Sequence, residues 1–511
     1  MQSVVILDFG SQTTQLIARR VRELGVYCEI HPFSLAIETL RAIGPGAIIL
    51  SGGPASVDEP DAPHPDPALL ELGVPVLGIC YGTQWLTAHF GGRVDHSLAR
   101  EFGRASVHID PTVSPIVDRF GGTQTVWMSH SDHIGALGAG FFQVAATADG
   151  VPAIIAHGER PIFGVQFHPE VHHTPHGREL FAAFLFDVAR LRNDWSANRF
   201  VGDVTARIQA QVGDGHVICG LSGGVDSAVA AALVHRAIGD RLHCIYVDNG
   251  LMRKDESADV VRTFRDELGF SMTAVDASER FLAALAGVSE PEQKRKIIGG
   301  LFVEVFEEAA QTFREAGFLC QGTLYPDVIE SVSVRGPSAT IKTHHNVGGL
   351  PERMRMKLVE PLRELFKDEV RAVGAEIGLP ERVLWRQPFP GPGLAIRILG
   401  AVTPERVKLL QAADAVVREE IAALPNARDV WQSFAVLLPV KSVGVMGDAR
   451  TYEHVCAIRA VSATDGMTAD VFPMPWEALG RMATRIVNEV RGINRVVYDV
   501  TSKPPGTIEW E

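Results

Sequence analysis

The chain has 511 residues, with 48 Lys and Arg against 61 Asp and Glu, a net charge of −13 and 46 % apolar side chains. At roughly 100–200 residues per domain, this length indicates about three domains with enough apolar material for folded cores, which excludes wholesale disorder. The acidic balance argues against a protein that mainly binds nucleic acid, and because no stretch approaches ~18 consecutive apolar residues, no membrane span is expected.

Cysteine usage and the first residues of the chain indicate the compartment. The six cysteines are scattered, without a Cys-x-x-Cys pair, which fits a reducing cytosol better than a disulfide framework. The first residues lack a basic segment and are typical of a strand rather than of a signal peptide. We therefore expect a cytoplasmic, multidomain protein.

The first third of the chain alternates short apolar runs with helical patterns, which is typical of an open α/β domain. Buried parallel strands are predicted over residues 4–7, 47–50, 74–79 and 162–167. Several of them end in Gly-rich turns, where ligands gather in sheets of this kind. A helix predicted over 178–191 is followed by a polar stretch, 192–198, that suits a domain boundary.

A second α/β domain is predicted to begin near residue 195. A strand over 217–221, a tight turn, a helix over 228–238 and a strand over 242–247 make a βαβ unit. The charged stretch 289–296 is a candidate mobile segment before a helix over 297–313. Residues 386–393 hold three prolines and two glycines, a breaker run that marks a second candidate boundary.

The predicted fold class is therefore α/β. Two open, mainly parallel-sheet domains are expected at 1–194 and 195–389, and a third domain that mixes helix and strand at 390–511.

A candidate nucleophile lies in Gly78-Ile-Cys-Tyr-Gly82, between a strand and a helical pattern. Small residues two before and two after a nucleophile permit a sharp turn that exposes its side chain, and a helix N-terminus favours the thiolate form of Cys80. His168, at the end of another strand, can take the thiol proton, and Glu170 can orient the imidazole.

Backbone donors for an oxyanion hole are also available. The N–H group of Tyr81 follows the nucleophile, and the turn after the strand at 47–50 offers a second N–H group, that of Gly53.

Two simpler interpretations stand beside this site. A lone cysteine is most often a small buried hydrophobe, as we expect for Cys28, Cys219, Cys244, Cys320 and Cys456. A metal site is an alternative at four histidines that crowd nine residues, His168, His172, His173 and His176. Pro169 and Pro175 interrupt any helix that would align these rings, so the catalytic interpretation is preferred.

Over about residues 1–190 the chain resembles the class I glutamine amidotransferases, whose catalytic motifs are matched by Cys80, His168 and Glu170. The resemblance implies hydrolysis of the glutamine side-chain amide through a glutamyl thioester, with release of ammonia. It also implies glutamine-binding residues in the helix after Cys80 and in a turn at 129–133, namely Gln84, Ser129, His130 and Asp132.

The hexapeptide Ser222-Gly-Gly-Val-Asp-Ser227 follows a predicted strand and opens a helix. Its backbone N–H groups can form an anion cradle, and its two glycines allow phosphate oxygens to approach closely. Its serines offer hydroxyl donors, and Asp226 offers a hard oxygen for Mg²⁺. The Walker pattern is absent, because no Lys follows the glycines.

This loop resembles the signature of the ATP pyrophosphatase family, which transfers AMP from ATP to a substrate oxygen. The resemblance implies ATP as co-substrate and Mg²⁺ as cofactor, with Asp226 as the metal ligand. The implied ATP-binding residues lie in the loop, on the next strand and in a later helix: Ser222, Gly223, Gly224, Val225, Asp226, Ser227, Ala228, Val247 and Lys367. For Lys367 the alternative of an ordinary surface lysine stays open.

The activated substrate is expected to be an anion, because local cations stand out in an acidic chain at 294–296, at Lys342 and at Lys503. Two prolines and a glycine fix the backbone after Lys503, where a frayed tail would be the ordinary expectation. Glu509 can accept paired donors such as the edge of a purine base.

Over essentially its whole length the chain resembles the glutamine-hydrolysing GMP synthases. Matching segments are 222–227, 294–299, 321–327, 342–349, 387–393 and the C-terminal run. The resemblance implies amination of XMP to GMP through an adenylyl intermediate, small-molecule substrates only, and a homodimer formed by a C-terminal dimerisation domain. The XMP-binding residues that it implies are Arg295, Gly391, Lys503, Ile508 and Glu509.

Other assignments fit the sequence less well. An ATP-dependent amidotransferase that makes NAD or asparagine would not explain the tail at 503–511. A tRNA-modifying PP-loop protein would need a basic face. A non-enzymatic nucleotide sensor would not need Cys80, His168 and Glu170 intact.

Overall fold

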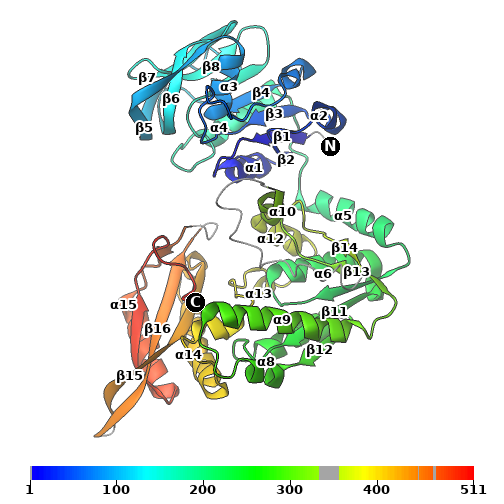
Figure 1. Ribbon diagram of the computed structural model, residues 1–511, viewed down its shortest axis with the longest axis vertical. Coiled ribbons are helices and arrows are strands. Elements are labelled where there is room, and N and C mark those ends of the chain that lie inside the picture. The colour runs from blue at the N-terminus through cyan, green and yellow to red at the C-terminus, as the bar shows by residue number, and fades with distance from the viewer. Residues whose placement is uncertain (1–2, 333–355, 447, 464–467) are drawn as a thin grey trace. The chain divides into compact units, whose positions relative to one another are not determined.

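The computed structural model describes residues 3–332, 356–446, 448–463 and 468–511 (Figure 1). By their contacts these residues form two compact units, 3–200 with 326–332 and 201–325 with 356–511. The segment 342–349 matched above lies outside the described residues. The domain boundaries at 194/195 and 389/390 stay predictions. Within the described part of the chain, no helix is long and apolar enough to cross a membrane.

The first unit is built on one mixed sheet. Its described strands are β1 (Ser3–Asp8), β2 (Tyr27–Pro32), β3 (Ala47–Leu50), β4 (Val76–Ile79), β5 (Arg93–Ile109), β6 (Gly122–Ala136), β7 (Phe141–Thr147), β8 (Pro152–His157) and β9 (Ile162–Val165). They lie in the order β2-β1-β3-β4-β9-β8-β7-β5-β6, parallel as far as β9 and antiparallel beyond it. The apolar run predicted as a strand at 47–50 is β3 with the same bounds.

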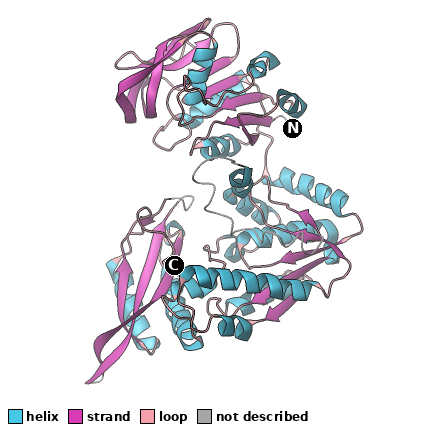
Figure 2. Ribbon diagram, viewed as in Figure 1, coloured by secondary structure: helices cyan, strands magenta, loops and turns pink. Residues whose placement is uncertain are grey.

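Helices flank this sheet (Figure 2). They are α1 (Thr14–Glu23), α2 (Ile37–Ile43), α3 (Tyr81–His89) and α4 (Gly177–Ala182), which continues as a π-helical turn over Ala183–Val188. The helix α3 packs on β3, β4 and β9. The central strands are fully apolar because both faces of the sheet are covered.

The second unit contains a parallel sheet. Its strands β10 (His216–Gly220), β11 (Leu242–Asp248), β12 (Met272–Asp276), β13 (Ala316–Cys320) and β14 (Lys357–Val359) lie in the order β12-β11-β10-β13-β14. The chain moves outward in both directions from β10, so the loop after β10 lies at a topological switch point, where α/β sheets bind ligands. The helices described here are α5 (Ala197–Val212), which begins at the end of the first unit, α6 (Val225–Ile238), α7 (Glu256–Val261), α8 (Ser278–Ala284), α9 (Pro291–Ala310), α12 (Lys367–Glu376) and α13 (Glu381–Leu384). By its contacts α10 (Tyr325–Val332) belongs to the first unit from Pro326 onward.

A second sheet lies in the C-terminal part of the same unit. It consists of β15 (Gln432–Met446), β16 (Ala449–Ser462), β17 (Asp470–Val471) and β18 (Ile493–Asp499), with β16 paired to the other three. The helices α14 (Pro404–Ala422) and α15 (Trp476–Glu489) pack together and against this sheet. One hydrophobic core includes Ile245 of β11, Val305 of α9, Leu410 of α14 and Leu437 of β15, so it joins both sheets.

The predicted α/β fold class is confirmed, whereas the predicted starts of two helices are wrong. The helix predicted over 297–313 begins at Pro291, so residues 291–296 of the charged stretch belong to α9. Proline is favoured at the first position of a helix, where its missing N–H would have no partner in any case. The helix α6 likewise begins at Val225, three residues earlier than predicted, so the second half of the predicted phosphate loop is its first turn.

Candidate active sites

Cys80 lies at the sharp turn between β4 and α3. It is the N-cap residue of α3 and has φ +49°, in the left-handed region that L side chains rarely adopt. The neighbouring glycines have no room for a side chain. A Cβ on Gly78 would lie 2.7 Å from the carbonyl carbon of Gly82, and a Cβ on Gly82 would lie 2.5 Å from the carbonyl oxygen of Leu50. The structure therefore contains the predicted strand–nucleophile–helix turn.

The predicted base and its orienting carboxylate follow β9 and lie together. His168 Nδ1 and Glu170 Oε1 are 2.7 Å apart, and both residues are buried. Glu170 Oε1 also accepts a hydrogen bond from the hydroxyl of Thr13 at 2.7 Å. Burial lowers the pKa of His168, but hydrogen bonds to Cys80 and Glu170 outweigh burial and raise the pKa to about 10. The imidazole therefore holds its proton between the Cys80 sulfur and the Glu170 carboxylate.

The turn after β3 approaches both catalytic candidates. A Cβ on Gly52 would lie 3.2 Å from His168 Cε1 and 3.7 Å from Cys80 Cβ. Gly53, predicted as an oxyanion donor, packs on Phe9, whose carbonyl oxygen would lie 2.8 Å from a Cβ there. Sequence reasoning missed the close approach of Gly52, although a Gly-Gly pair at a strand end was a signal for it.

Tyr81, the other predicted oxyanion donor, is the first residue of α3. No intrahelical carbonyl can accept from an N–H group at this position, so this donor is available to a ligand.

The predicted glutamine-binding residues lie on α3 and β6, which both border the Cys80–His168 pair. Gln84 is one helical turn beyond Cys80, and its Nε2 donates to the carbonyl oxygen of Asp132 at 2.9 Å. The Asp132 carboxylate lies 2.7 Å from His96 Nδ1. The backbone N–H of His168 donates to β6 at 2.9 Å. The elements therefore bring these residues to one place.

The other two predicted glutamine-binding residues, Ser129 and His130, are neighbours in β6 but differ in burial. Burial, followed by the charge of His168, lowers the pKa of His130 to about 4, whereas Ser129 is exposed. The predicted turn at 129–133 is wrong, because these residues belong to the long strand β6 and pair with β5.

The alternative of a metal site at the clustered histidines is not supported. The described residues contain no group of three or more His, Cys, Asp or Glu side chains that could hold a metal ion. His173 stacks on Trp127 and His176 stacks on Phe120, so aromatic contacts account for these rings.

The loop between β10 and α6 is folded as an anion cradle. Gly223 has φ +74°, which favours glycine, and Gly224 is the N-cap residue of α6. The Ser222 hydroxyl accepts from the Gly224 N–H at 3.2 Å and lies 3.0 Å from the Ser227 hydroxyl. The free N–H groups of the first turn of α6 open into this loop. Behind it, Ala228 and Val247 are buried in the core of the unit.

Lys367 and Asp226 are brought together beside this cradle. Lys367 is the first residue of α12, its side chain is 44 % exposed, and its Nζ donates to Asp226 Oδ2 at 2.9 Å. Its role as a phosphate contact stays a prediction. Asp226 Oδ1 is buried and has no hydrogen-bond partner among the described residues. A buried carboxylate oxygen without a partner is costly, and a bound ligand or ion would satisfy it.

An arginine that sequence reasoning missed braces the same loop. Arg386 donates to the carbonyl oxygen of Gly223 and forms an ion pair with Glu256. The available sequence signal was its position at the start of the proline-rich run at 386–393, where a side chain is held close to the backbone of other loops.

The C-terminal tail is packed rather than frayed. The fully buried Arg459 donates to the carbonyl oxygens of Thr501, Thr507 and Ile508. Lys503 forms a β-bridge with Ala469. The tail therefore has a defined path past β16.

Glu509 meets its paired donors inside the chain. Arg397 donates to it through Nε at 3.0 Å and through Nη2 at 2.7 Å, and Gln432 Nε2 donates at 2.8 Å. Three of the roughly four acceptor positions of this carboxylate are therefore taken, and its contact with a purine edge stays a prediction.

The N-terminal turns of α9 hold the end of the tail. Arg295 donates to the backbone oxygen of Glu511. The neighbouring Lys294 is fully buried, and its ammonium donates to the carbonyl oxygens of Ala395 at 3.1 Å and Ile398 at 2.7 Å and pairs with the Glu511 carboxylate. Four of the predicted XMP residues thus lie on or against the tail, while Gly391 is exposed in the run at 386–393.

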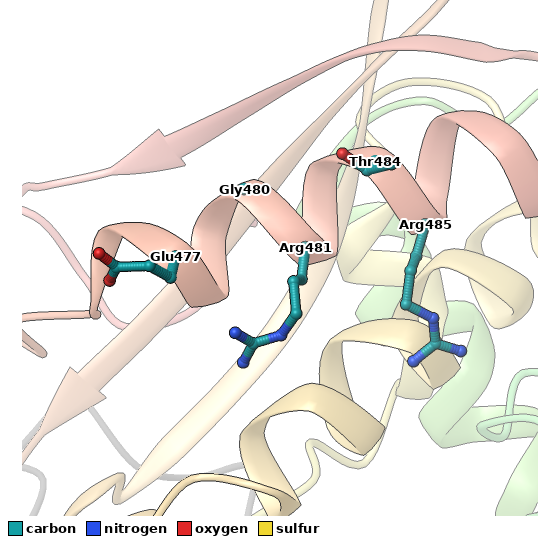
Figure 3. A pocket seen from close by; sticks show the side chains of 5 residues that line it. All are labelled: Glu477, Gly480, Arg481, Thr484 and Arg485. Carbon is teal, nitrogen blue, oxygen red and sulfur yellow. The ribbon is translucent and has the colours of Figure 1, made fainter.

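A further pocket of about 380 Å³ is lined by residues of α15 from Glu477 to Arg485. Figure 3 shows these side chains along the helix. Arg481 pairs with Glu420 at 2.9 Å and Arg485 pairs with Glu419 at 2.7 Å. Because carboxylates of α14 already neutralise these guanidinium groups, the pocket is a poor anion site.

Comparisons with known proteins agree with this division of the chain. Three family models match it: glutamine amidotransferase class-I over residues 5–188, NAD synthase over 198–300 and GMP synthase C terminal domain over 419–510. A protein named GMP synthase (glutamine-hydrolyzing) from Phenylobacterium zucineum is 60 % identical over 514 residues, which cover 100 % of this chain and 99 % of the relative. Proteins of the same name from Rhizobium etli and Brachyspira hyodysenteriae are 58 % and 56 % identical, and the matches cover 100 % of this chain and 98 % and 99 % of theirs. Since identity this high extends over whole chains, the predicted family is confirmed: the chain belongs to the glutamine-hydrolysing GMP synthases.

Proposed function

We propose that the chain converts XMP to GMP, with ATP as the activating co-substrate and the glutamine side-chain amide as the source of nitrogen. One observation carries this proposal. The same chain holds a buried thiol–imidazole–carboxylate site at a strand–helix turn and an anion cradle of the ATP pyrophosphatase kind. We assign residues 1–194 to the amidotransferase, 195–389 to the synthetase and 390–511 to dimerisation and XMP binding.

At the first site the Cys80 sulfur attacks the glutamine amide carbon. His168 carries the thiol proton to the leaving nitrogen, and Glu170 fixes the orientation of the imidazole through the 2.7 Å contact. The N–H groups of Gly53 and Tyr81 stabilise the negative charge on the amide oxygen. Ammonia leaves, and water then hydrolyses the thioester to glutamate and regenerates the thiol. Gln84, Ser129, His130 and Asp132 bind the glutamine substrate.

At the second site the 2-oxygen of XMP attacks the α-phosphorus of ATP, and pyrophosphate leaves. The loop residues Ser222–Ser227 with Ala228 hold the phosphates through their N–H and hydroxyl groups, Lys367 adds a positive charge, and Val247 lines the adenosine side. Ammonia then displaces AMP from the adenylated carbon, which yields GMP.

Mg²⁺ fits this site. The buried, unpartnered Asp226 Oδ1 is a hard oxygen beside the cradle, and Mg²⁺ is commonly held by one or two carboxylates together with substrate phosphates. Bound there, the ion would neutralise charge on the pyrophosphate leaving group.

We place XMP against Arg295, Gly391, Lys503, Ile508 and Glu509. The cations Arg295 and Lys503 suit its phosphate, and the last open acceptor position of Glu509 suits one N–H donor of the base. The packed tail supports this assignment, because ordered residues lose little further entropy when they bind a ligand.

A homodimer in the cytoplasm is the third part of the proposal. On the hairpin of β15 and β16, Val443 and Tyr452 face each other across the strands and are 46 % and 58 % exposed. An apolar pair of this kind on a hairpin suits a contact with a second copy. Size-exclusion chromatography with light scattering, applied to the wild type and to Val443→Glu, tests this point. Only the wild type should elute with the mass of a dimer.

The experiment that tests the reaction mixes the protein with ATP, Mg²⁺ and XMP and follows the fall in absorbance as XMP becomes GMP, with glutamine or ammonium as donor. Conversion with both donors supports the whole scheme. Conversion with ammonium alone contradicts the role of the Cys80 site. No conversion with either donor, in a folded protein, contradicts the assignment of XMP as acceptor.

A further inference from the structure

The segment Arg386-Gln-Pro-Phe389, which we call the strap, connects the two ends of the synthetase site within the second unit. At its first residue, Arg386 reaches the phosphate loop. One guanidinium nitrogen donates to the carbonyl oxygen of Gly223, and another pairs with Glu256. A Cβ on Gly223 would lie 2.5 Å from Arg386 Nη1, so the guanidinium is packed directly on the loop.

The other end of the strap reaches the residues that hold the C-terminal tail. The Pro388 carbonyl oxygen accepts from Gln432 Nε2 at 3.2 Å, and the same amide donates to Glu509 at 2.8 Å. The Phe389 ring lies 5.1 Å from the Arg397 guanidinium carbon, and Arg397 binds Glu509. Gln387 is fixed by the backbone N–H of Ser433 at 3.0 Å.

A second arginine closes the connection inside the strap. Arg253 is buried and stacks on Phe389 at 4.5 Å, and it donates to the Pro388 carbonyl oxygen at 3.4 Å. Its backbone N–H donates to Glu256 at 2.9 Å. Hydrogen bonds therefore run without interruption from Gly223 through Arg386, Glu256, Arg253, Pro388 and Gln432 to Glu509.

This network retains unused bonding capacity. Among the described residues, Arg253 Nε, Arg397 Nη1 and Asp414 Oδ2 are buried without hydrogen-bond partners, and Arg253 Nε lies 3.8 Å from Asp414 Oδ2. Buried polar atoms without partners are costly, so a small shift that closes this gap would be favourable. A shift that brought Arg253 Nε to Asp414 Oδ2 would give both atoms a partner, and a second arrangement of this kind is what coupling between two sites requires.

We propose that the strap couples the two nucleotide sites, with Arg386 as the residue that positions the phosphate loop according to the state of Glu509. The inference rests on the proposed function, which places XMP at Glu509 and ATP at the loop. A ligand that pulls Glu509 shifts Gln432 and Pro388, and Arg386 passes that shift to Gly223. XMP and ATP thereby tighten each other's binding.

The test measures binding of α,β-methylene-ATP with Mg²⁺, whose α–β bridge cannot be cleaved, in the absence and presence of saturating XMP. In the wild type XMP should lower the Kd of the analogue on the order of tenfold, and by linkage the analogue should lower the Kd of XMP by the same factor. In Arg386→Lys, which keeps the charge but loses the two-pronged contact, both factors should fall to about one.

Arg382→Lys is the matched control. Arg382 lies four residues upstream, is 53 % exposed and pairs with Glu267, so this variant should keep the wild-type factor. Amide exchange of residues 222–228 gives a second readout. Addition of XMP should slow it in the wild type and leave it unchanged in Arg386→Lys.

The outcomes separate the two claims. No binding of XMP to the wild type overturns the proposed function. Binding of XMP and of the analogue without mutual effect, or a mutual effect that survives in Arg386→Lys, overturns the strap inference alone. Loss of the mutual effect in Arg382→Lys as well would show a general structural disturbance and would also overturn it.

Discussion

The His168 imidazole is buried and forms hydrogen bonds with the Cys80 sulfur and the Glu170 carboxylate. Its pKa in the folded protein, about 10, stands above the ordinary value of about 6.5. The folded state therefore holds the proton more tightly than the unfolded state does. The resulting stabilisation is complete below about pH 6.5 and is lost as the pH rises through about 10.

Glu170→Gln should reveal this dependence. At pH 6 the loss of a charge-assisted hydrogen bond should lower the stability of the first unit by about 2 kcal/mol, a shift of about 4–8 °C in its thermal midpoint. The difference between wild type and variant should shrink between pH 7 and 10, as scanning calorimetry over that range can show. Glu179→Gln is the control, because its side chain is 43 % exposed and its carboxylate lies 3.8 Å from His176, so the effect should be close to zero. A difference that grows with pH would contradict the assignment of the proton.

In the second unit, Lys294 is likewise a buried charge that depends on a neighbouring carboxylate. Its ammonium is fully buried, and the Glu511 carboxylate is the charge that compensates it. Glu511→Gln should destabilise the second unit by about 3 kcal/mol, because a buried charge then keeps only neutral acceptors. The variant should also bind XMP more weakly, since Arg295 and the tail meet at Glu511.

Urea unfolding followed by tryptophan fluorescence, together with an XMP titration, measures both effects. Glu489→Gln removes an exposed carboxylate that pairs with Arg485 and should change neither quantity. If Glu511→Gln and Glu489→Gln had the same unfolding free energy and the same affinity for XMP, the buried charge of Lys294 would not depend on Glu511.

At the level of elements, the turn into α3 depends on the absence of side chains. Alanine is normally the better helix residue, yet a Cβ on Gly82 would lie 2.5 Å from the backbone oxygen of Leu50. Gly82→Ala should therefore displace Cys80, abolish GMP formation with glutamine and spare the reaction with ammonium.

Gly202→Ala is the matched control for this change. Gly202 lies within α5 with no atom within 4 Å of its would-be Cβ, so the variant should gain about 0.5–1 kcal/mol and keep both activities. For both variants, steady-state rates with glutamine and with ammonium measure the two activities, and the thermal midpoint measures the stability. Full glutamine-dependent activity in Gly82→Ala would mean that the turn tolerates a shift of β3.

The elements could be predicted where the signal is local. The buried run at 47–50 is a strand with the predicted bounds, because four consecutive apolar residues between turns have few alternatives. The start of α9 could not be predicted in this way. Its charged first turns are typical of a solvated segment, and the carbonyls that bind Lys294 come from residues about a hundred positions later in the chain.

At the level of the whole molecule, both candidate sites could be predicted because their reacting groups lie in a few short motifs at strand ends. The residues around them could not. Thr13 reaches Glu170 from the N-cap position of α1, and Arg397 reaches Glu509 from a 3₁₀ turn, so only the folded chain brings these partners together. Sequence patterns therefore identify the reacting groups, and the structure identifies what holds them.

Each compact unit carries one of the two sites, so the half-reactions should be separable by single substitutions. Cys80→Ala removes the nucleophile of the first unit and should abolish GMP formation with glutamine while ammonium-dependent formation continues at about the wild-type rate. Asp226→Asn removes the charge beside the phosphate cradle and should lower formation with both donors by on the order of a hundredfold or more. Glutamine hydrolysis by this second variant should persist at a measurable rate, because Cys80, His168 and Glu170 are untouched.

Two controls keep this test specific. Cys28→Ala removes another buried thiol of the first unit, and Asp259→Asn removes an exposed carboxylate of the second, 54 % exposed and paired with Arg262. Neither should change the ratio of the two activities. Parallel assays of GMP and glutamate would show the separation directly. If Cys80→Ala lost both activities equally while remaining folded, the first unit would have to shape the synthetase site itself, and the independence of the two half-reactions would be wrong.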